Sequence, residues 1–130
     1  MSVNNDIRVA VFDRISTADI LPVAWPNVHY DGTKPYCRVF FLSVPTSALG
    51  IRQLNLYEGI VQVDVVVSSG VGEIVAIGYC DQFINLFPRN LYLTQNTTEI
   101  GFIEPGYPGP AIQEDDGYFL PVSIPYKIIL

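Results

Sequence analysis

The side chains that most often carry out catalysis are few in this chain and lie far apart in the sequence. His29 is the only histidine of the sequence, and it stands beside Tyr30 in a proline-containing connector, where a structural role is the commoner one. Ser68 and Ser69 lie in no GxSxG context, and a second histidine that could complete a triad does not exist. These residues therefore give no indication of nucleophilic or acid–base catalysis.

Three further patterns could bind an ion or a phosphate, and each lacks the spacing that this chemistry needs. The run Glu114-Asp115-Asp116 offers carboxylates, which Ca²⁺ and Mg²⁺ prefer, but not the DxDxDG arrangement. Gly70-Val71-Gly72 has neither the lysine of a phosphate loop nor the full GxGxxG. Cys37 and Cys80 show no CxxC or Cys/His spacing, so we expect two buried thiols that behave as small apolar groups. The sequence predicts no enzyme, no cofactor and no metal site.

The composition points to a surface that is partly covered by another protein. At 130 residues the chain fits one domain, 1–130. Charged residues make up 15% of it, against about 25% in an average soluble protein, while apolar residues reach 49%. Uninterrupted apolar stretches stay far below the ~20 residues of a membrane span. The net charge of −6 argues against nucleic-acid binding, because such binding needs Lys and Arg side chains to neutralise phosphates.

The elements that must position any site follow from periodicity. Residues 3–16 and 72–87 have helical spacing, and residues 36–44, 54–67, 98–104 and 118–129 read as strands. The segment Pro105–Pro110 is expected to form neither helix nor ladder. We expect an α+β fold, a mainly antiparallel sheet with two helices packed on one face. The apolar stripe of the first helix is predicted to consist of Val3, Ile7, Ala10, Val11 and Ile15. That of the second is predicted to consist of Ile74, Ile77, Cys80, Ile84 and Phe87, widened by Tyr79, Phe83 and Leu86.

The second predicted strand, 54–67, is too long for the body of such a domain. It would extend roughly 46 Å at ~3.3 Å per residue. Its first part is therefore expected to leave the body, together with the end of the preceding strand, as a protruding β-hairpin. The tip carries Leu49, Ile51 and Leu54 with a single charge, Arg52. Apolar residues on an exposed tip predict a contact with a partner.

The last predicted strand contains two prolines that favour a place at the sheet edge. Pro121 and Pro125 are four residues apart, so their missing N–H groups lie on the same side of the strand. Proline is tolerated in a sheet where that side has no neighbour. We expect this strand at an edge, or covered there by another subunit, with Val122 and Ile124 contributing a second interface.

The order of these features resembles a known family over nearly the whole chain. The strongest pieces are Ala24-Trp-Pro-Asn27, Gly59-Ile-Val-Gln-Val-Asp-Val65 and Pro121-Val-Ser-Ile-Pro-Tyr126. In this order they are similar to the tail terminator-like (tail completion) proteins of long-tailed bacteriophages. None of these pieces is a catalytic motif, so the likeness rests on their joint order.

The resemblance implies a virion structural protein, made in the host cytoplasm and located at the head-proximal end of the tail. Such proteins form a ring, typically a hexamer, that stops polymerisation of the tube protein and presents a surface to the head connector or neck protein. DNA passes through the ring without specific binding, and no membrane is involved. Glu114, Asp115 and Asp116 are candidates for the acidic lumen. The alternative is a small protein- or ligand-binding module of the host, with a pocket between the helices and the sheet.

Overall fold

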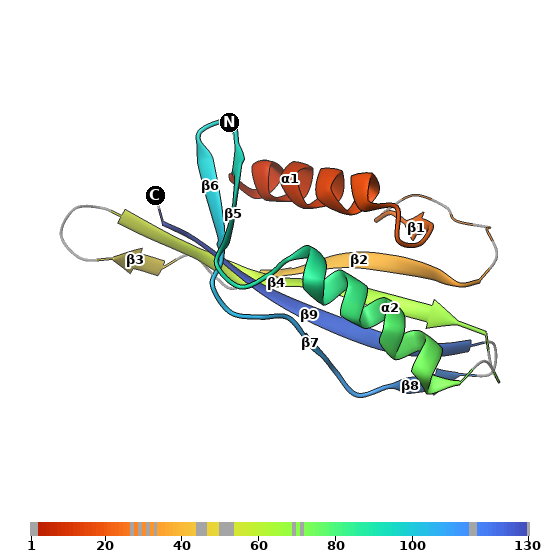
Figure 1. Ribbon diagram of the computed structural model, residues 1–130. Coiled ribbons are helices and arrows are strands. Elements are labelled where there is room, and N and C mark those ends of the chain that lie inside the picture. The colour runs from red at the N-terminus through yellow and green to blue at the C-terminus, as the bar shows by residue number, and fades with distance from the viewer. Residues whose placement is uncertain are drawn as a thin grey trace.

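The computed structural model describes residues 3–26, 28, 30, 32, 34–43, 47–49, 54–68, 70, 72–114 and 117–129. These residues form an α+β fold of two layers, a long curled sheet and two helices (Figure 1). The helices are α1 (Val3–Ala18) and α2 (Glu73–Leu86). The strands are β1 (Val23–Ala24), β2 (Tyr36–Ser43), β3 (Ser47–Leu49), β4 (Leu54–Val67), β5 (Leu91–Gln95), β6 (Thr98–Phe102), β7 (Tyr107–Pro108), β8 (Ile112–Glu114) and β9 (Gly117–Ile129).

The sheet is built around the two longest strands. Its order is β1-β2-β4-β9-β6-β5, and β3, β7 and β8 attach at the sides of β4 and β9. β4 and β9 pair antiparallel from Leu56 opposite Ile129 to Val67 opposite Tyr118. Among the described strands only β1 and β2 pair in parallel. The predicted α+β class and the mainly antiparallel sheet are confirmed.

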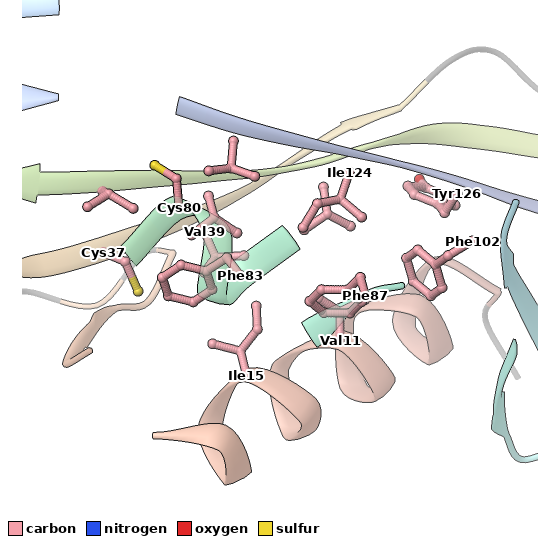
Figure 2. Packing of buried hydrophobic residues seen from close by; sticks show 14 of the residues in the cluster. Val11, Ile15, Cys37, Val39, Cys80, Phe83, Phe87, Phe102, Ile124 and Tyr126 are labelled. Atoms are coloured by element: carbon pink, nitrogen blue, oxygen red, sulfur yellow. The ribbon is translucent and has the colours of Figure 1, made fainter. Parts of the chain in front are cut away.

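Both helices lie on one face of the sheet and close the core against it (Figures 1 and 2). The alternation of side chains along β4 directs its odd-numbered valines, Val61 to Val67, into the core. α1 buries Ile7, Val11 and Ile15 on the expected stripe. The largest fully buried side chains are the rings of Phe83, Phe87 and Phe102.

The predicted stripe of the second helix is wrong at its first position. Ile74 is 89% exposed, whereas Ala76, Cys80 and Phe83 are fully buried, as is Phe87 just beyond the helix. A helix turns by about 100° per residue, so Ile74 lies some 200° away from Ala76. The inward face is therefore centred on Ala76, Cys80, Phe83 and Phe87.

A buried polar cluster fastens the β5–β6 hairpin to α1. Asp6 in α1 is only 2% exposed, although it is an acidic residue. Its carboxylate accepts hydrogen bonds from the Thr98 hydroxyl at 2.7 Å and from the Asn96 side-chain amide at 2.8 Å. Asp6 also lies in the first turn of α1, where the helix dipole favours a negative charge. These contacts offset the cost of burying the carboxylate.

The prediction that the last strand lies at a sheet edge is wrong. β9 has β4 along one side and β6, β7 and β8 along the other. The carbonyl of Pro121 accepts a hydrogen bond from the N–H of Gly109 at 2.7 Å, so this side of the proline faces away from β4. Pro125 lies on the same side by parity. The prolines thus spare the continuous β4 ladder and face only short, interrupted neighbours, which explains why an interior strand tolerates them.

The expectation that Pro105–Pro110 forms no ladder is also corrected. Tyr107 pairs with Ser123 and Pro108 pairs with Val122, which makes β7 a short strand beside β9. A two-residue strand needs few N–H donors, so the prolines around it are tolerated.

The expected hairpin is present at the end of the long strand. β4 pairs with β2 only from Gly59 onward, while Leu54 to Leu56 pair with β3. Figure 1 shows β3 and the beginning of β4 beyond the end of β2. The protruding β-hairpin of the predicted fold is thereby confirmed.

Gly59 permits a close approach where the hairpin leaves the body. A Cβ atom at this position would lie 2.6 Å from the carbonyl oxygen of Leu42 and 2.7 Å from the hydroxyl of Tyr126. Tyr126, the cross-strand partner of Gly59, is only 3% exposed. The glycine therefore gives this tyrosine ring its place in the core.

Candidate interaction surfaces

Within the described part of the chain, His, Cys, Asp and Glu side chains form no group that could hold a metal ion. His29 and Ser69 lie outside the described residues, and the side chain of Ser68 is exposed. No described helix has the length and apolar character to cross a membrane.

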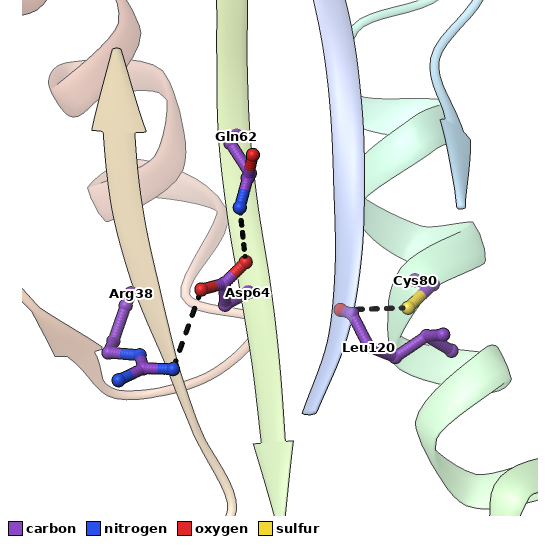
Figure 3. Close-up of polar contacts among 5 residues, drawn as sticks. All are labelled: Arg38, Gln62, Asp64, Cys80 and Leu120. Carbon is purple, nitrogen blue, oxygen red and sulfur yellow. Dashed lines mark hydrogen bonds and ion pairs between the residues drawn. The ribbon is translucent and has the colours of Figure 1, made fainter. Parts of the chain in front are cut away.

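The two cysteines are buried and free, as predicted. Burial raises the pKa of Cys37 to about 12. Burial, followed by the charge of Asp81, raises the pKa of Cys80 to about 12 as well. The Cys80 thiol points at the carbonyl oxygen of Leu120, 3.9 Å away (Figure 3). At neutral pH both groups are thus protonated, and a nucleophilic role would need the thiolate.

The sheet face opposite the helices carries a cluster of polar and aromatic side chains. The Arg38 guanidinium on β2 lies 3.5 Å from the Asp64 carboxylate on β4, and the Gln62 amide donates to the same carboxylate at 2.9 Å (Figure 3). The guanidinium carbon also lies 4.5 Å from the ring centroid of Phe119. The Nε of Arg38 is buried and has no hydrogen-bond partner among the described residues.

This cluster is suited to contact rather than to chemistry. Arginine and aromatic residues are enriched in protein interfaces, and a partly exposed ion pair by itself stabilises a fold by up to about 1 kcal/mol. Two large apolar side chains lie on β2 beside the cluster, Phe40 at 40% exposure and Leu42 at 51%. They alternate with the buried Cys37 and Val39, so they belong to the helix-free face.

The structure describes only part of the predicted hairpin patch of Leu49, Ile51, Arg52 and Leu54. Leu49 and Leu54 are cross-strand partners where β3 pairs with β4. Ile51 and Arg52 lie outside the described residues. The contact of this hairpin with a partner therefore stays a prediction.

The second predicted patch is corrected for its two side chains. Val122 and Ile124 are both 0% exposed and belong to the core between the sheet and the helices (Figure 2 labels Ile124). Their burial follows from the interior position of β9, which the prolines had suggested to be an edge. These side chains are not available to a neighbouring subunit.

Of the acidic run Glu114-Asp115-Asp116, the structure describes only Glu114. Glu114 ends β8 and pairs with Gly117 at the start of β9. Asp115 and Asp116, between these strands, lie outside the described residues. The assignment of this run to a lumen is still a prediction.

The space between helices and sheet, where the alternative reading placed a ligand pocket, is filled by core side chains. A surface hollow of ≈ 390 Å³ lies instead at the ends of both helices, lined by Asp13, Arg14, Thr17, Ala18 and Leu86. Arg14 donates from its Nε to the carbonyl oxygen of Leu86 at 2.6 Å, a bond that joins α1 to the C-terminal end of α2. The positive charge of Arg14 complements the negative end of the α2 dipole, so this contact has a structural role.

Sequence reasoning missed the helix-free face as a candidate surface. The signal was available, because Arg38, Phe40 and Leu42 alternate with core residues along one strand. It also missed Asp6, although this residue lies three positions after Val3 and four before Ala10, on the apolar stripe itself.

The described residues form a one-sided α+β sheet whose helix-free face carries exposed apolar and arginine side chains. The chain belongs to the phage tail terminator protein family, whose model matches residues 6–126. It is accordingly a structural protein of a phage tail, and its family implies contact with tail and head components and a place in the virion.

The comparison with solved structures agrees with this fold. One similar solved chain superposes with a TM-score of 0.80 at 28% sequence identity, covering 98% of this chain and 96% of its own length. This likeness supports the fold and adds no function. No curated protein matches the chain.

Proposed function

We propose that this protein caps the head-proximal end of the tail tube as a ring, ends polymerisation of the tube protein and joins the tail to the head connector or neck protein. The observation that carries the proposal is the family match over residues 6–126. The proposed ring is a hexamer that assembles in the host cytoplasm and ends up in the virion. One ring face binds the tube and the other binds the connector.

A ring of identical copies needs two different, complementary patches on each copy. The low proportion of charged residues and the exposed Phe40 and Leu42 on the helix-free face support such patches. The hairpin with Leu49, Ile51, Arg52 and Leu54 is proposed to bind the tube protein or a neighbouring copy. It extends beyond the body, so it can reach across a subunit boundary.

The net charge of −6 supports passage of DNA without binding. Phosphates are repelled by carboxylates, and a lumen that carries Glu114, Asp115 and Asp116 would let DNA slide. The mechanism uses no covalent chemistry: the protein acts by occupying the tube end, as a non-enzymatic subunit.

Tail length tests the proposal directly. Tails are assembled with and without this protein, and tube lengths are measured by electron microscopy. We expect uniform tubes ending in a ring when the protein is present, and tubes of uncontrolled length that do not join heads when it is absent. Equal length distributions in both preparations would refute capping. A binding module of the host, the alternative, would leave tubes unchanged and bind no tail.

A further inference from the structure

One long side of β2 is open over most of the strand. β1 pairs with β2 only at Cys37 and Arg38. Beyond them, no described strand pairs with the side of β2 that faces away from β4. The N–H of Cys37 donates outward to the carbonyl of Pro22 at 2.9 Å. Because backbone groups alternate along a strand, those of Phe41 and Ser43 also face outward.

This open edge lacks the devices that normally protect edges. Exposed edge strands usually carry charges, prolines or bulges, because an unprotected edge pairs with other chains. Residues 39–43 read Val-Phe-Phe-Leu-Ser, with no charge and no proline. Phe40 and Leu42 are 40% and 51% exposed on it. Such an edge indicates that another strand covers it in the assembled protein.

The opposite end of the sheet has a second strand edge, on β5, a strand that also packs against α1. β5 is the last strand of the order, and among the described strands it pairs only with β6. Its residues read Leu-Tyr-Leu-Thr-Gln, again with no charge and no proline. Tyr92 is 53% exposed there. The open stretch of β2, residues 39–43, and β5, residues 91–95, are equally long.

We propose that the open edge of β2 in one copy pairs with β5 of the next copy, so that the sheet continues from subunit to subunit. The inference rests on the proposed ring and deepens it by naming the two complementary patches. The two edges lie at opposite ends of the strand order and differ in sequence, which makes the contact heterologous, as ring closure requires. Main-chain hydrogen bonds hold the copies together, and the exposed side chains of Phe40, Leu42 and Tyr92 pack across the boundary.

Paired cysteines test the contact on the assembled particle. Phe40→Cys or Leu42→Cys is combined with Tyr92→Cys or Thr94→Cys in one chain, because cross-strand neighbours come close enough for a disulfide. The native thiols are buried and do not interfere. We expect at least one of the four combinations to give covalent multimers up to the full ring on purified tails under mild oxidation. The control combines Leu42→Cys with Ile74→Cys on the exposed side of α2, and no multimers are expected from it.

The outcomes separate this inference from the proposed function. Protein that is present on tails but forms no multimers with any of the four combinations overturns the edge pairing alone. Multimers from the control pair overturn it too, because they would place α2 against β2. Absence of the protein from tails refutes the proposed function.

A charge placed at the edge gives a second readout. Leu42→Lys introduces the missing edge charge at an exposed site, and we expect at least a tenfold loss of incorporation into tails with an unchanged melting temperature. Ile74→Lys, with the same change on α2, is expected to assemble normally. Wild-type incorporation of Leu42→Lys would contradict the proposal.

Discussion

Replacing Asp6 tests how the β5–β6 hairpin is held to α1. Asp6→Ala removes the acceptor of two side-chain hydrogen bonds, from Thr98 at 2.7 Å and from Asn96 at 2.8 Å. Thr98 is only 4% exposed, so its hydroxyl loses its partner without gaining water. Asn96 is exposed and turns to solvent instead. The cost therefore falls mainly on the Asp6–Thr98 pair.

The magnitude follows from this difference in exposure. A hydrogen bond to a charged group stabilises by about 1.5–3 kcal/mol, and a buried hydroxyl left unpaired costs about 1–3 kcal/mol. We expect Asp6→Ala to lower the free energy of unfolding by about 2–4 kcal/mol. With an unfolding entropy of ~2.1 cal/mol/K per residue, this corresponds to a melting temperature lower by roughly 7–15 °C. Asp6→Asn keeps one acceptor oxygen and should lose roughly half as much.

Urea unfolding followed by circular dichroism measures these changes. Asp13→Ala, at an exposed aspartate of the same helix, serves as the control and should stay within about 0.5 kcal/mol of the wild type. A double-mutant cycle with Thr98→Val should give a coupling energy of about 1–2 kcal/mol. If Asp6→Ala unfolds no more easily than Asp13→Ala, or if the two changes are additive, the polar cluster does not hold the hairpin.

Two further predictions concern close packing and the thiols. Gly59→Ala brings a methyl group to 2.6 Å from the Leu42 carbonyl oxygen, and we expect the free energy of unfolding in urea to fall by about 1–3 kcal/mol. In the control Gly78→Ala, no atom lies within 4 Å of the added Cβ, and the free energy of unfolding should rise by up to about 1 kcal/mol. Equal effects of the two substitutions would contradict the reasoning. Cys37 and Cys80 should resist iodoacetamide at pH 8 until urea unfolds the chain, and rapid labelling of the native protein would refute their burial. Since their pKa rises from 9.0 to about 12 on folding, the stability they contribute is complete below pH 9 and falls as the pH rises toward 12.

The long elements were predictable because their own side chains repeat with a clear period. The range 54–67 was predicted as a strand and is β4 with the same bounds, because its odd-numbered valines alternate with positions of mixed character, among them Gln62 and Asp64. α1 ends two residues later than expected and keeps its stripe. The short strands β1, β3, β7 and β8 were missed, since two or three residues carry no period. The five-residue strand β5 was missed as well.

The interaction surfaces were harder to predict, because exposure depends on what packs alongside. The prediction that the prolines of β9 leave one side of the strand without N–H donors was correct. It did not foresee that the short strands β7 and β8 lie on that side. That misplacement turned Val122 and Ile124 into interface candidates, while both are core residues. The prediction that Ile74 is buried was wrong for a related reason. A helix with apolar residues on several sides does not reveal which side packs against the sheet.

By itself the sequence determined the α+β class, the inward faces of α1 and β4, the projecting hairpin and the resemblance to tail terminators, because local periodicity and motif order are encoded along the chain. Only the tertiary structure decided that β9 lies inside the sheet and that the outer sides of β2 beyond Arg38 and of β5 face no other described strand. Strand order depends on contacts between residues far apart in sequence, and no local pattern records which edge lacks a neighbour.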